Sequence, residues 1–138
     1  MSPIRAAVVA ECHRCGIRVV PLVGPSSILL ALMASGLNGQ SFAFNGYLPV
    51  KPPERSRAIR FFERRAQAEG QSQLFIEAPY RNVKLFEELL RTLAPTTRLT
   101  LAVDVTAPGE RIITRTVAEW QRQPLPEMNK RPAIFIIG

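Results

Sequence analysis

The sequence lacks the features that mark membrane and secreted proteins. No apolar run reaches the roughly 18 residues that a membrane-spanning helix needs, and the N-terminus has no signal-peptide pattern. We therefore expect no membrane association and a cytoplasmic location. The chain also has only two cysteines and one histidine, which limits the metal and disulfide chemistry open to it.

These three residues lie close together, at Cys12, His13 and Cys15. A structural zinc site needs four ligands, and the sequence has no second pair of cysteine or histidine residues. Residues 6–15 also have a helical pattern, so we interpret the cysteines as ordinary thiols on a helix and expect no metal. A metal shared between two copies of the chain is the alternative, and nothing in the sequence supports it.

The common catalytic arrangements are absent as well. The chain has no Ser-His-Asp set, no phosphate-binding loop with a lysine and no intact glycine-rich dinucleotide fingerprint. What is present is the composition of a globular chain, with 138 residues of which 46% are hydrophobic and 21% charged. The net charge of +7, carried mainly by arginine, favours an anionic partner such as nucleic acid, although a GC-rich genome also enriches arginine.

Helical and strand patterns alternate along the chain. Apolar spacing and glycine or proline boundaries predict helices over residues 6–15, 27–35, 54–69, 82–93 and 118–123. The same criteria predict strands over residues 17–23, 42–48, 73–77, 98–106, 110–117 and 133–137. This order indicates an α/β fold with a mixed parallel and antiparallel sheet of about five to six strands flanked by helices. The turn at Pro108-Gly109 makes part of that sheet antiparallel.

Three polar loops follow the ends of predicted strands, at residues 24–27, 77–81 and 104–107. Ligands bind outside the carboxyl ends of the strands in an open α/β sheet, so these loops would line one cleft if their strands are neighbours. Ser26 and Ser27 stand where a strand passes into a helix. They either cap that helix, which is the commoner arrangement, or hold a small polar ligand.

The loop at residues 77–81 has the most chemical character. Glu77 would accept hydrogen bonds or a proton, Arg81 would hold a phosphate, and Tyr80 would stack on a base. The alternative is an ion pair between Glu77 and Arg81 with Tyr80 in the core. Tyr47 and Lys51 precede an arginine-rich helix, which is either a nucleic-acid surface or a solvated helix face.

Four segments in series resemble one known family. They are residues 19–27 (VVPLVGPSS), 34–37 (ASGL), 44–49 (FNGYLP) and 75–81 (FIEAPYR). In this order and spacing they are similar to the tetrapyrrole methylase superfamily, in the branch that contains the small-subunit ribosomal RNA ribose 2′-O-methyltransferase. The resemblance extends over nearly the whole chain from about residue 6.

The resemblance implies an S-adenosylmethionine-dependent methyltransferase of two α/β domains, with the cofactor in the cleft between them, usually as a homodimer. Residues 17–138 would form the C-terminal methylase domain. Residues 1–16 would be the end of the N-terminal cofactor domain or an artificial start. With only half of the cofactor cleft, the chain is expected to be inactive alone.

The matched positions imply roles for individual residues. Expected cofactor contacts are Ser26, Ser27, Glu77, Val105, Thr106, Pro132 and Ala133. Expected substrate contacts are Tyr47, Lys51, Tyr80 and Arg81. Catalysis in such enzymes consists largely of holding the methyl group in line with its acceptor, and Glu77 and Asp104 are the candidates for removing a proton.

Two positions depart from the ribosomal branch. Tyr80 stands where that branch usually has histidine, and Val103-Asp104-Val105-Thr106-Ala107 replaces its Arg-Glu-Leu-Thr-Lys run. The substrate therefore stays open between a ribose hydroxyl on RNA, which the basic residues favour, and a small tetrapyrrole-like molecule. An alternative of another class is a non-catalytic RNA-binding or dimerisation domain on the same fold.

Overall fold

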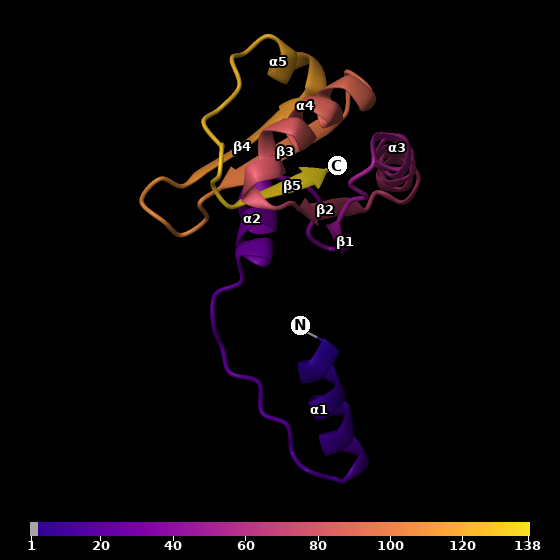
Figure 1. Cartoon of the computed structure of the whole chain (residues 1–138), viewed down its shortest axis with the longest axis vertical. Helices are drawn as coiled ribbons and strands as arrows, with labels where there is room; N and C mark the ends of the chain where they lie inside the picture. Colours follow the sequence, from indigo (N-terminus) through magenta and orange to yellow (C-terminus); the bar gives the residue numbers. More distant parts are fainter. Residues whose placement is uncertain (1–2) are drawn as a thin grey trace.

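A five-stranded sheet with helices on both faces forms the body of the molecule (Figure 1), as seen in a computed structural model that describes residues 3–138. The strands are β1 (Phe42–Tyr47), β2 (Ser72–Ile76), β3 (Arg98–Val103), β4 (Arg111–Thr116) and β5 (Ala133–Ile137). The helices are α1 (Pro3–Arg14), α2 (Ser27–Ser35), α3 (Pro52–Glu69), α4 (Asn82–Thr92) and α5 (Val117–Gln121), with a short 3₁₀ turn η1 (Pro79–Arg81). Met1 and Ser2, the first residues of the expected artificial start, lie outside the described residues.

The strand order in the sheet is β1-β2-β5-β3-β4. Strands β1 and β2 run parallel, whereas β5 is antiparallel to both β2 and β3, and β3 forms an antiparallel hairpin with β4. The predicted mixed α/β sheet and the hairpin at Pro108-Gly109 are therefore confirmed. The chain returns at its C-terminus to fill the central position between two strands that are far apart in the sequence.

Alternate residues of the strands supply two separate apolar layers. One layer packs against α3, α4 and α5, and its largest side chains include Phe75, Phe86, Phe135 and Trp120. The indole of Trp120 packs edge-on against Phe86 at 5.1 Å between ring centroids and donates a hydrogen bond to the Leu99 carbonyl at 2.8 Å. The second, smaller layer packs under α2.

An ion pair inside the larger layer fastens α3 to α4. The guanidinium of Arg55 donates to the carboxylate of Glu88, which also accepts a hydrogen bond of 2.9 Å from the Ser56 hydroxyl. The side chains of Arg55 and Glu88 are only 9% and 5% exposed. A buried pair adds little net stability, but either charge without its partner is costly.

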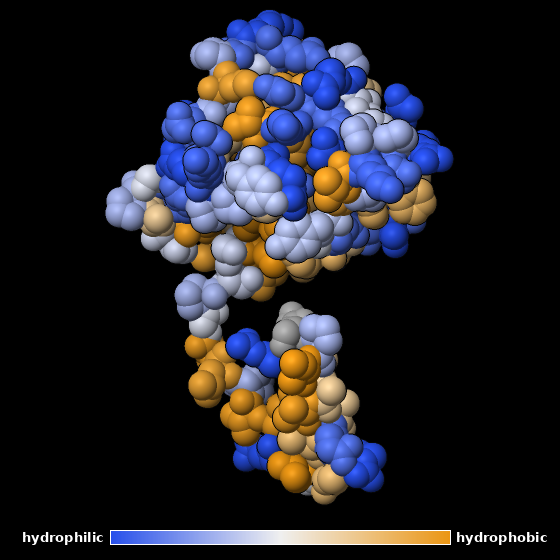
Figure 2. All heavy atoms as spheres, viewed as in Figure 1, coloured by the Kyte–Doolittle hydropathy of each residue, from blue (hydrophilic) through white to orange (hydrophobic). Residues whose placement is uncertain are grey.

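The N-terminal segment is the part that sequence patterns predicted least well. Helix α1 buries no residue, and the following segment, up to α2, is extended and lies away from the sheet (Figure 1). The predicted strand over residues 17–23 is wrong, because neither edge of the described sheet pairs with it. Leu22 and Val23 are almost fully exposed, and Figure 2 shows apolar side chains gathered along α1 and this segment.

The remaining predicted elements are confirmed, with shifts of one to three residues at their ends. The largest shifts are of three residues: α1 begins at Pro3 rather than at Ala6, and β3 ends at Val103 rather than at Thr106. Asp104 and Thr106 adopt positive φ angles of 51° and 71°, which extended backbone does not allow, so the strand stops there. No helix within residues 3–138 is long and apolar enough to cross a membrane.

Replacing Glu88 with alanine is expected to lower the free energy of unfolding by about 3 kcal/mol, because Arg55 then stays buried without its partner. Urea denaturation followed by Trp120 fluorescence measures the loss. The matched control is Glu54→Ala, which removes an exposed pair with Arg57 and should cost less than about 1 kcal/mol. Equal losses in the two variants would contradict the special role of the buried pair.

Candidate functional site

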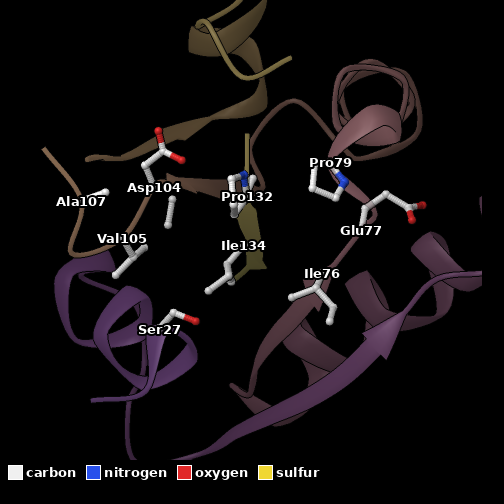
Figure 3. Close-up of a pocket in the computed structure, with 11 residues that line it drawn as sticks. Ser27, Ile76, Glu77, Pro79, Asp104, Val105, Ala107, Pro132 and Ile134 are labelled. Carbon is white, nitrogen blue, oxygen red and sulfur yellow. The ribbon is translucent and has the colours of Figure 1, made fainter. Parts of the chain in front are cut away.

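The central position of β5 brings three chain segments to one edge of the sheet. Because β5 is antiparallel to its neighbours, its first residues lie beside the carboxyl ends of β2 and β3, with Ile134 opposite Ile76 and Ala133 opposite Val103. The N-terminus of α2 covers this edge. Together they enclose a cavity of about 350 Å³, shown in Figure 3.

Most of the residues predicted to contact the cofactor, and both proposed catalytic carboxylic acids, meet at this cavity. The predicted residues that line it are Ser27, Glu77, Asp104, Val105, Pro132 and Ala133. Four chain segments, each separated from the next by more than 20 residues, thus meet here, and residues of all three predicted loops are among them. The expected neighbouring strands are not the reason, because no strand in the described part of the chain precedes residues 24–27 and β5 lies between β2 and β3. The roles of the lining residues as ligand contacts stay predictions.

Two predicted cofactor residues lie beside the cavity rather than in its lining. Ser26 is the N-cap residue of α2 and is half-buried, but its side chain makes no capping hydrogen bond; only its carbonyl accepts, from Leu30 N–H at 2.9 Å. Thr106 is exposed, and its backbone N–H donates to the carboxylate of Glu110 at 2.9 Å. Ser27, in contrast, extends its hydroxyl toward Ile76 and Ile134 (Figure 3).

Glu77 holds the turn that leaves β2. Its Oε1 atom accepts a hydrogen bond of 2.7 Å from the Ala78 N–H and one of 3.1 Å from the Arg81 guanidinium. Its side chain is 1% exposed, and Oε2 has no hydrogen-bond partner among residues 3–138. Figure 3 shows its carboxylate turned away from the middle of the cavity.

The ion pair of Glu77 with Arg81 is therefore formed, but the rest of that alternative is wrong, because Tyr80 is 66% exposed and not in the core. The hydrogen bond to Glu77 is the main cause that raises the pKa of Arg81 above its ordinary value. Tyr47, Lys51 and Tyr80 are exposed and lie outside the cavity lining, as does Arg81.

Asp104 is occupied by a second arginine. Arg131 donates from Nε to the Asp104 carboxylate at 2.7 Å, and from Nη2 to the Gly109 carbonyl at 2.9 Å. The backbone N–H of Asp104 donates to the Pro132 carbonyl at 3.0 Å. These bonds join the loop after β3 to the loop before β5, and a Cβ at Gly109 would lie 2.6 Å from Arg131 Nη2. The two loops at the rim are thus fixed to each other.

Five further residues line the cavity; two of them lie within the predicted loops but were not named, and three on the strands were missed. The five are Ile76, Pro79, Ala102, Ala107 and Ile134. Ala102 and Ile134 are partners across β3 and β5 on the face under α2. Because side chains alternate along a strand, Ala102 and Ile134 face away from the side of the sheet on which Val103 and Ala133 lie. The sequence could give this alternation, but not the pairing of β3 with β5 that puts Ala102 beside Ile134. The small side chain of Ala102 leaves space in the floor of the cavity.

Within residues 3–138, no three His, Cys, Asp or Glu side chains are grouped so that they would hold a metal ion. The groups that the cavity presents are a polar rim, an apolar floor and the N-terminus of α2. Exposed helix N–H groups and strand ends are typical places for a small polar ligand in α/β proteins.

Comparison with curated proteins gives two informative relatives. The chain is 31% identical over 129 residues to ribosomal RNA small subunit methyltransferase I of Escherichia coli O157:H7, with 94% of the chain aligned. It is 33% identical over 111 residues to the enzyme of the same name from Vibrio cholerae serotype O1, with 80% of the chain aligned. Over most of its own length, the chain is therefore similar to the ribosomal RNA small subunit methyltransferase I proteins. It spans 44% and 37% of the lengths of these two relatives.

No family model matches the chain, but solved methyltransferase structures share its fold. The methyltransferase CobJ superposes with a TM-score of 0.56 at 19% identity, over 96% of the chain and 56% of CobJ. Cobalt precorrin-4 methyltransferase CbiF superposes with a TM-score of 0.55 at 15% identity, over 96% of the chain and 57% of CbiF. The resemblance to tetrapyrrole methylases is confirmed at the level of the fold.

Arg131→Ala and Asp104→Ala are each expected to lower the free energy of unfolding by about 1–2 kcal/mol, because each leaves its partner's charge unpaired at the rim. The double variant should lose little more than either single variant, since both remove the same contact. Chemical denaturation of the four proteins measures this coupling. Arg122→Ala, at an exposed arginine, is the control and should cost less than about 0.5 kcal/mol. Additive losses would contradict the rim contact.

Proposed function

We propose that this chain supplies one wall of the S-adenosylmethionine site of a methyltransferase that acts on ribosomal RNA at a ribose 2′-hydroxyl. The observation that carries the proposal is the cavity between β2, β3, β5 and the start of α2, which is lined by Ser27, Glu77, Val105, Pro132 and Ala133. The names of the relatives support the activity and the RNA substrate.

The residues of the cavity suit the proposed cofactor. Ile76, Ala102 and Ile134 form an apolar floor against which a flat adenine ring would pack. The hydroxyl of Ser27 and the first N–H groups of α2 provide donors for polar groups at one side. S-adenosylmethionine supplies an electrophilic methyl group when it is bound. The protein's own part is to exclude water and to hold donor and acceptor in line.

Glu77 and Asp104 remain the proposed proton acceptors, and the geometry distinguishes them. Arg131 binds Asp104 at 2.7 Å, which supports a role in positioning the rim loops. Glu77 is the stronger candidate because its Oε2 atom has no partner in the described part of the chain. Deprotonation of a hydroxyl would need Glu77 to turn Oε2 toward the acceptor.

RNA is the proposed acceptor because the chain is basic and the exposed face of α3 is rich in arginine. Lys51 and the exposed arginines of α3, including Arg57, Arg60 and Arg64, carry positive charge, and the whole chain has a net charge of +7. An RNA substrate is in keeping with a cytoplasmic location. A tetrapyrrole-like small molecule is the second candidate, favoured by the fold shared with CbiF. A non-catalytic RNA-binding or dimerisation domain is a third, and cofactor binding separates it from both enzymes.

We also propose that the protein works as a homodimer and that the chain does not transfer methyl groups alone. Exposed apolar side chains on the N-terminal segment and on α2 support this association, because a second copy of the chain would cover them. They are Ile4, Val8, Ile17, Val20, Leu22, Val23, Leu29 and Met33. Patches of this kind on soluble proteins mark contact sites. The 44% coverage of the Escherichia coli relative supports the need for further residues at the cleft.

Calorimetric titration with S-adenosylhomocysteine tests the cofactor site. Ser27→Arg places a long charged side chain in the cavity and is expected to weaken binding at least about tenfold, which corresponds to roughly 1.4 kcal/mol. Thr96→Arg, at an exposed turn far along the chain, introduces the same charge and should leave the affinity unchanged. Equal affinities for all three proteins would place the ligand elsewhere. Because the chain is proposed to supply one wall of the site, the same titration is made on the whole protein, and no binding there by a folded sample would favour the non-catalytic domain.

Light scattering coupled to size exclusion tests the proposed association. Leu22→Glu places a charge on a side chain that is 91% exposed and is expected to shift the protein toward the monomer. Val50→Glu, at an apolar residue that is 56% exposed on the main body, is the control and should leave the mass unchanged. A monomeric unmodified chain, or equal shifts in both variants, would contradict association through this segment.

A further inference from the structure

Two tyrosines stand exposed at the ends of neighbouring strands, next to the cavity. Tyr47 ends β1 and is 63% exposed, and Tyr80 follows β2 and is 66% exposed. Strands β1 and β2 are parallel, with Tyr47 opposite Ile76. Both strands therefore end on the side of the sheet where Ile76 lines the cavity. Tyrosine combines an apolar ring with a polar hydroxyl, and such rings are common at surfaces that contact other molecules.

Arg81 fixes the ring of Tyr80 from one side. Its guanidinium carbon lies 4.7 Å from the ring centroid, and its Nη1 donates to the Tyr80 hydroxyl. The same guanidinium donates to Glu77 at 3.1 Å, and the Glu77 side chain is buried. A buried carboxylate therefore holds the arginine, and the arginine holds the ring, so little side-chain entropy remains to be lost when a ligand stacks on the other face.

The electrostatics link the second tyrosine to the same group. Glu77 is the largest cause that raises the pKa of Arg81, and the phenols of Tyr80 and Tyr47 contribute in the same direction. Arg81 is therefore a permanent cation with both tyrosines within electrostatic reach. We refer to Tyr47, Tyr80 and Arg81 together as the tyrosine platform.

The tyrosine platform continues directly from the cavity. Glu77 and Pro79 line the cavity, and Tyr80 and Arg81 are the next residues of the same turn. Lys51 lies four residues beyond Tyr47 and precedes the first turn of α3. A flat group stacked on Tyr80 would thus sit beside the turn that lines the cavity, with Arg81 in contact with the ring to receive an attached phosphate.

We propose that the tyrosine platform receives the base of an unpaired nucleotide of the RNA substrate, stacked on the free face of Tyr80. This inference rests on the proposed function and adds that the protein binds the acceptor nucleotide in an unpaired state. Paired bases present their faces only to neighbouring bases, so a ring that stacks needs a single-stranded or extruded nucleotide. Contacts of Arg81 and Lys51 with phosphates would position the RNA but would not distinguish one base sequence from another.

The test compares two labelled RNA probes of equal length and charge by fluorescence anisotropy. One is a single-stranded oligonucleotide of mixed sequence, and the other is its abasic counterpart, which keeps the phosphates but has no bases. The unmodified chain should prefer the probe with bases by about 5- to 150-fold for one stacked base. Tyr80→Leu should lose most of that preference and Tyr80→Phe should keep it. A duplex of the same sequence should bind Tyr80→Leu and the unmodified chain equally well, because its paired bases cannot stack on the ring.

Phe42→Leu is the matched control, because Phe42 is an exposed aromatic at the opposite end of β1. It should keep the preference for bases. The salt dependence of binding should be the same in Tyr80→Leu as in the unmodified chain, since no phosphate contact is removed, and should be weaker in Lys51→Glu. Thermal melting of each variant shows whether it remains folded.

Three outcomes would overturn the inference. They are an unmodified chain that binds both probes equally, a Tyr80→Leu variant that keeps the full preference, and an anionic porphyrin that binds in a Tyr80-dependent way while RNA binding ignores Tyr80. Titration with S-adenosylhomocysteine on the same proteins separates the two hypotheses. Cofactor binding without a preference for bases refutes the platform alone, whereas a folded whole protein that does not bind S-adenosylhomocysteine refutes the proposed function.

Discussion

The backbone pairing of β5 between β2 and β3 is the constraint on which the rest of the structure depends. This strand is buried along its whole length and divides the apolar side chains into two layers. Because it runs antiparallel to both neighbours, its amino end lies at the carboxyl ends of the others. The ends of β2 and β3 and the start of β5 together form the cavity, and the N-terminus of α2 covers it.

Two arginines hold the rim of this cavity in the same manner. Arg131 binds the Asp104 carboxylate and carbonyls of two loops, and Arg81 binds the Glu77 carboxylate and the Tyr80 ring. In each case a carboxylate at a strand end orients a guanidinium that in turn orients a neighbouring group. Preorganised rims of this kind lower the entropy lost on binding. The carboxylic acids that looked catalytic in the sequence therefore also have a structural explanation.

Local patterns predicted the elements well because those signals are contained within each segment. The amphipathic residues 82–93 and the apolar residues 133–137 needed no knowledge of their neighbours, and Pro108-Gly109 specified its own hairpin. Contacts between distant segments were not predictable in this way. Nothing local connects Asp104 with Arg131, which is 27 residues later, or indicates that Asp104 and Thr106 take positive φ angles.

The wrong strand over residues 17–23 and the exposed position of Tyr80 have one physical cause in common. A strand propensity expresses suitability for a half-buried surface, and it is realised only where a neighbouring strand supplies the ladder. In the same way, an aromatic residue joins a core only where the backbone turns it inward, and η1 turns Tyr80 outward onto Arg81. Exposed apolar and aromatic residues at such places indicate surfaces that other molecules complete. The exposed residues of the N-terminal segment and of the tyrosine platform are therefore best explained as contact surfaces for other molecules.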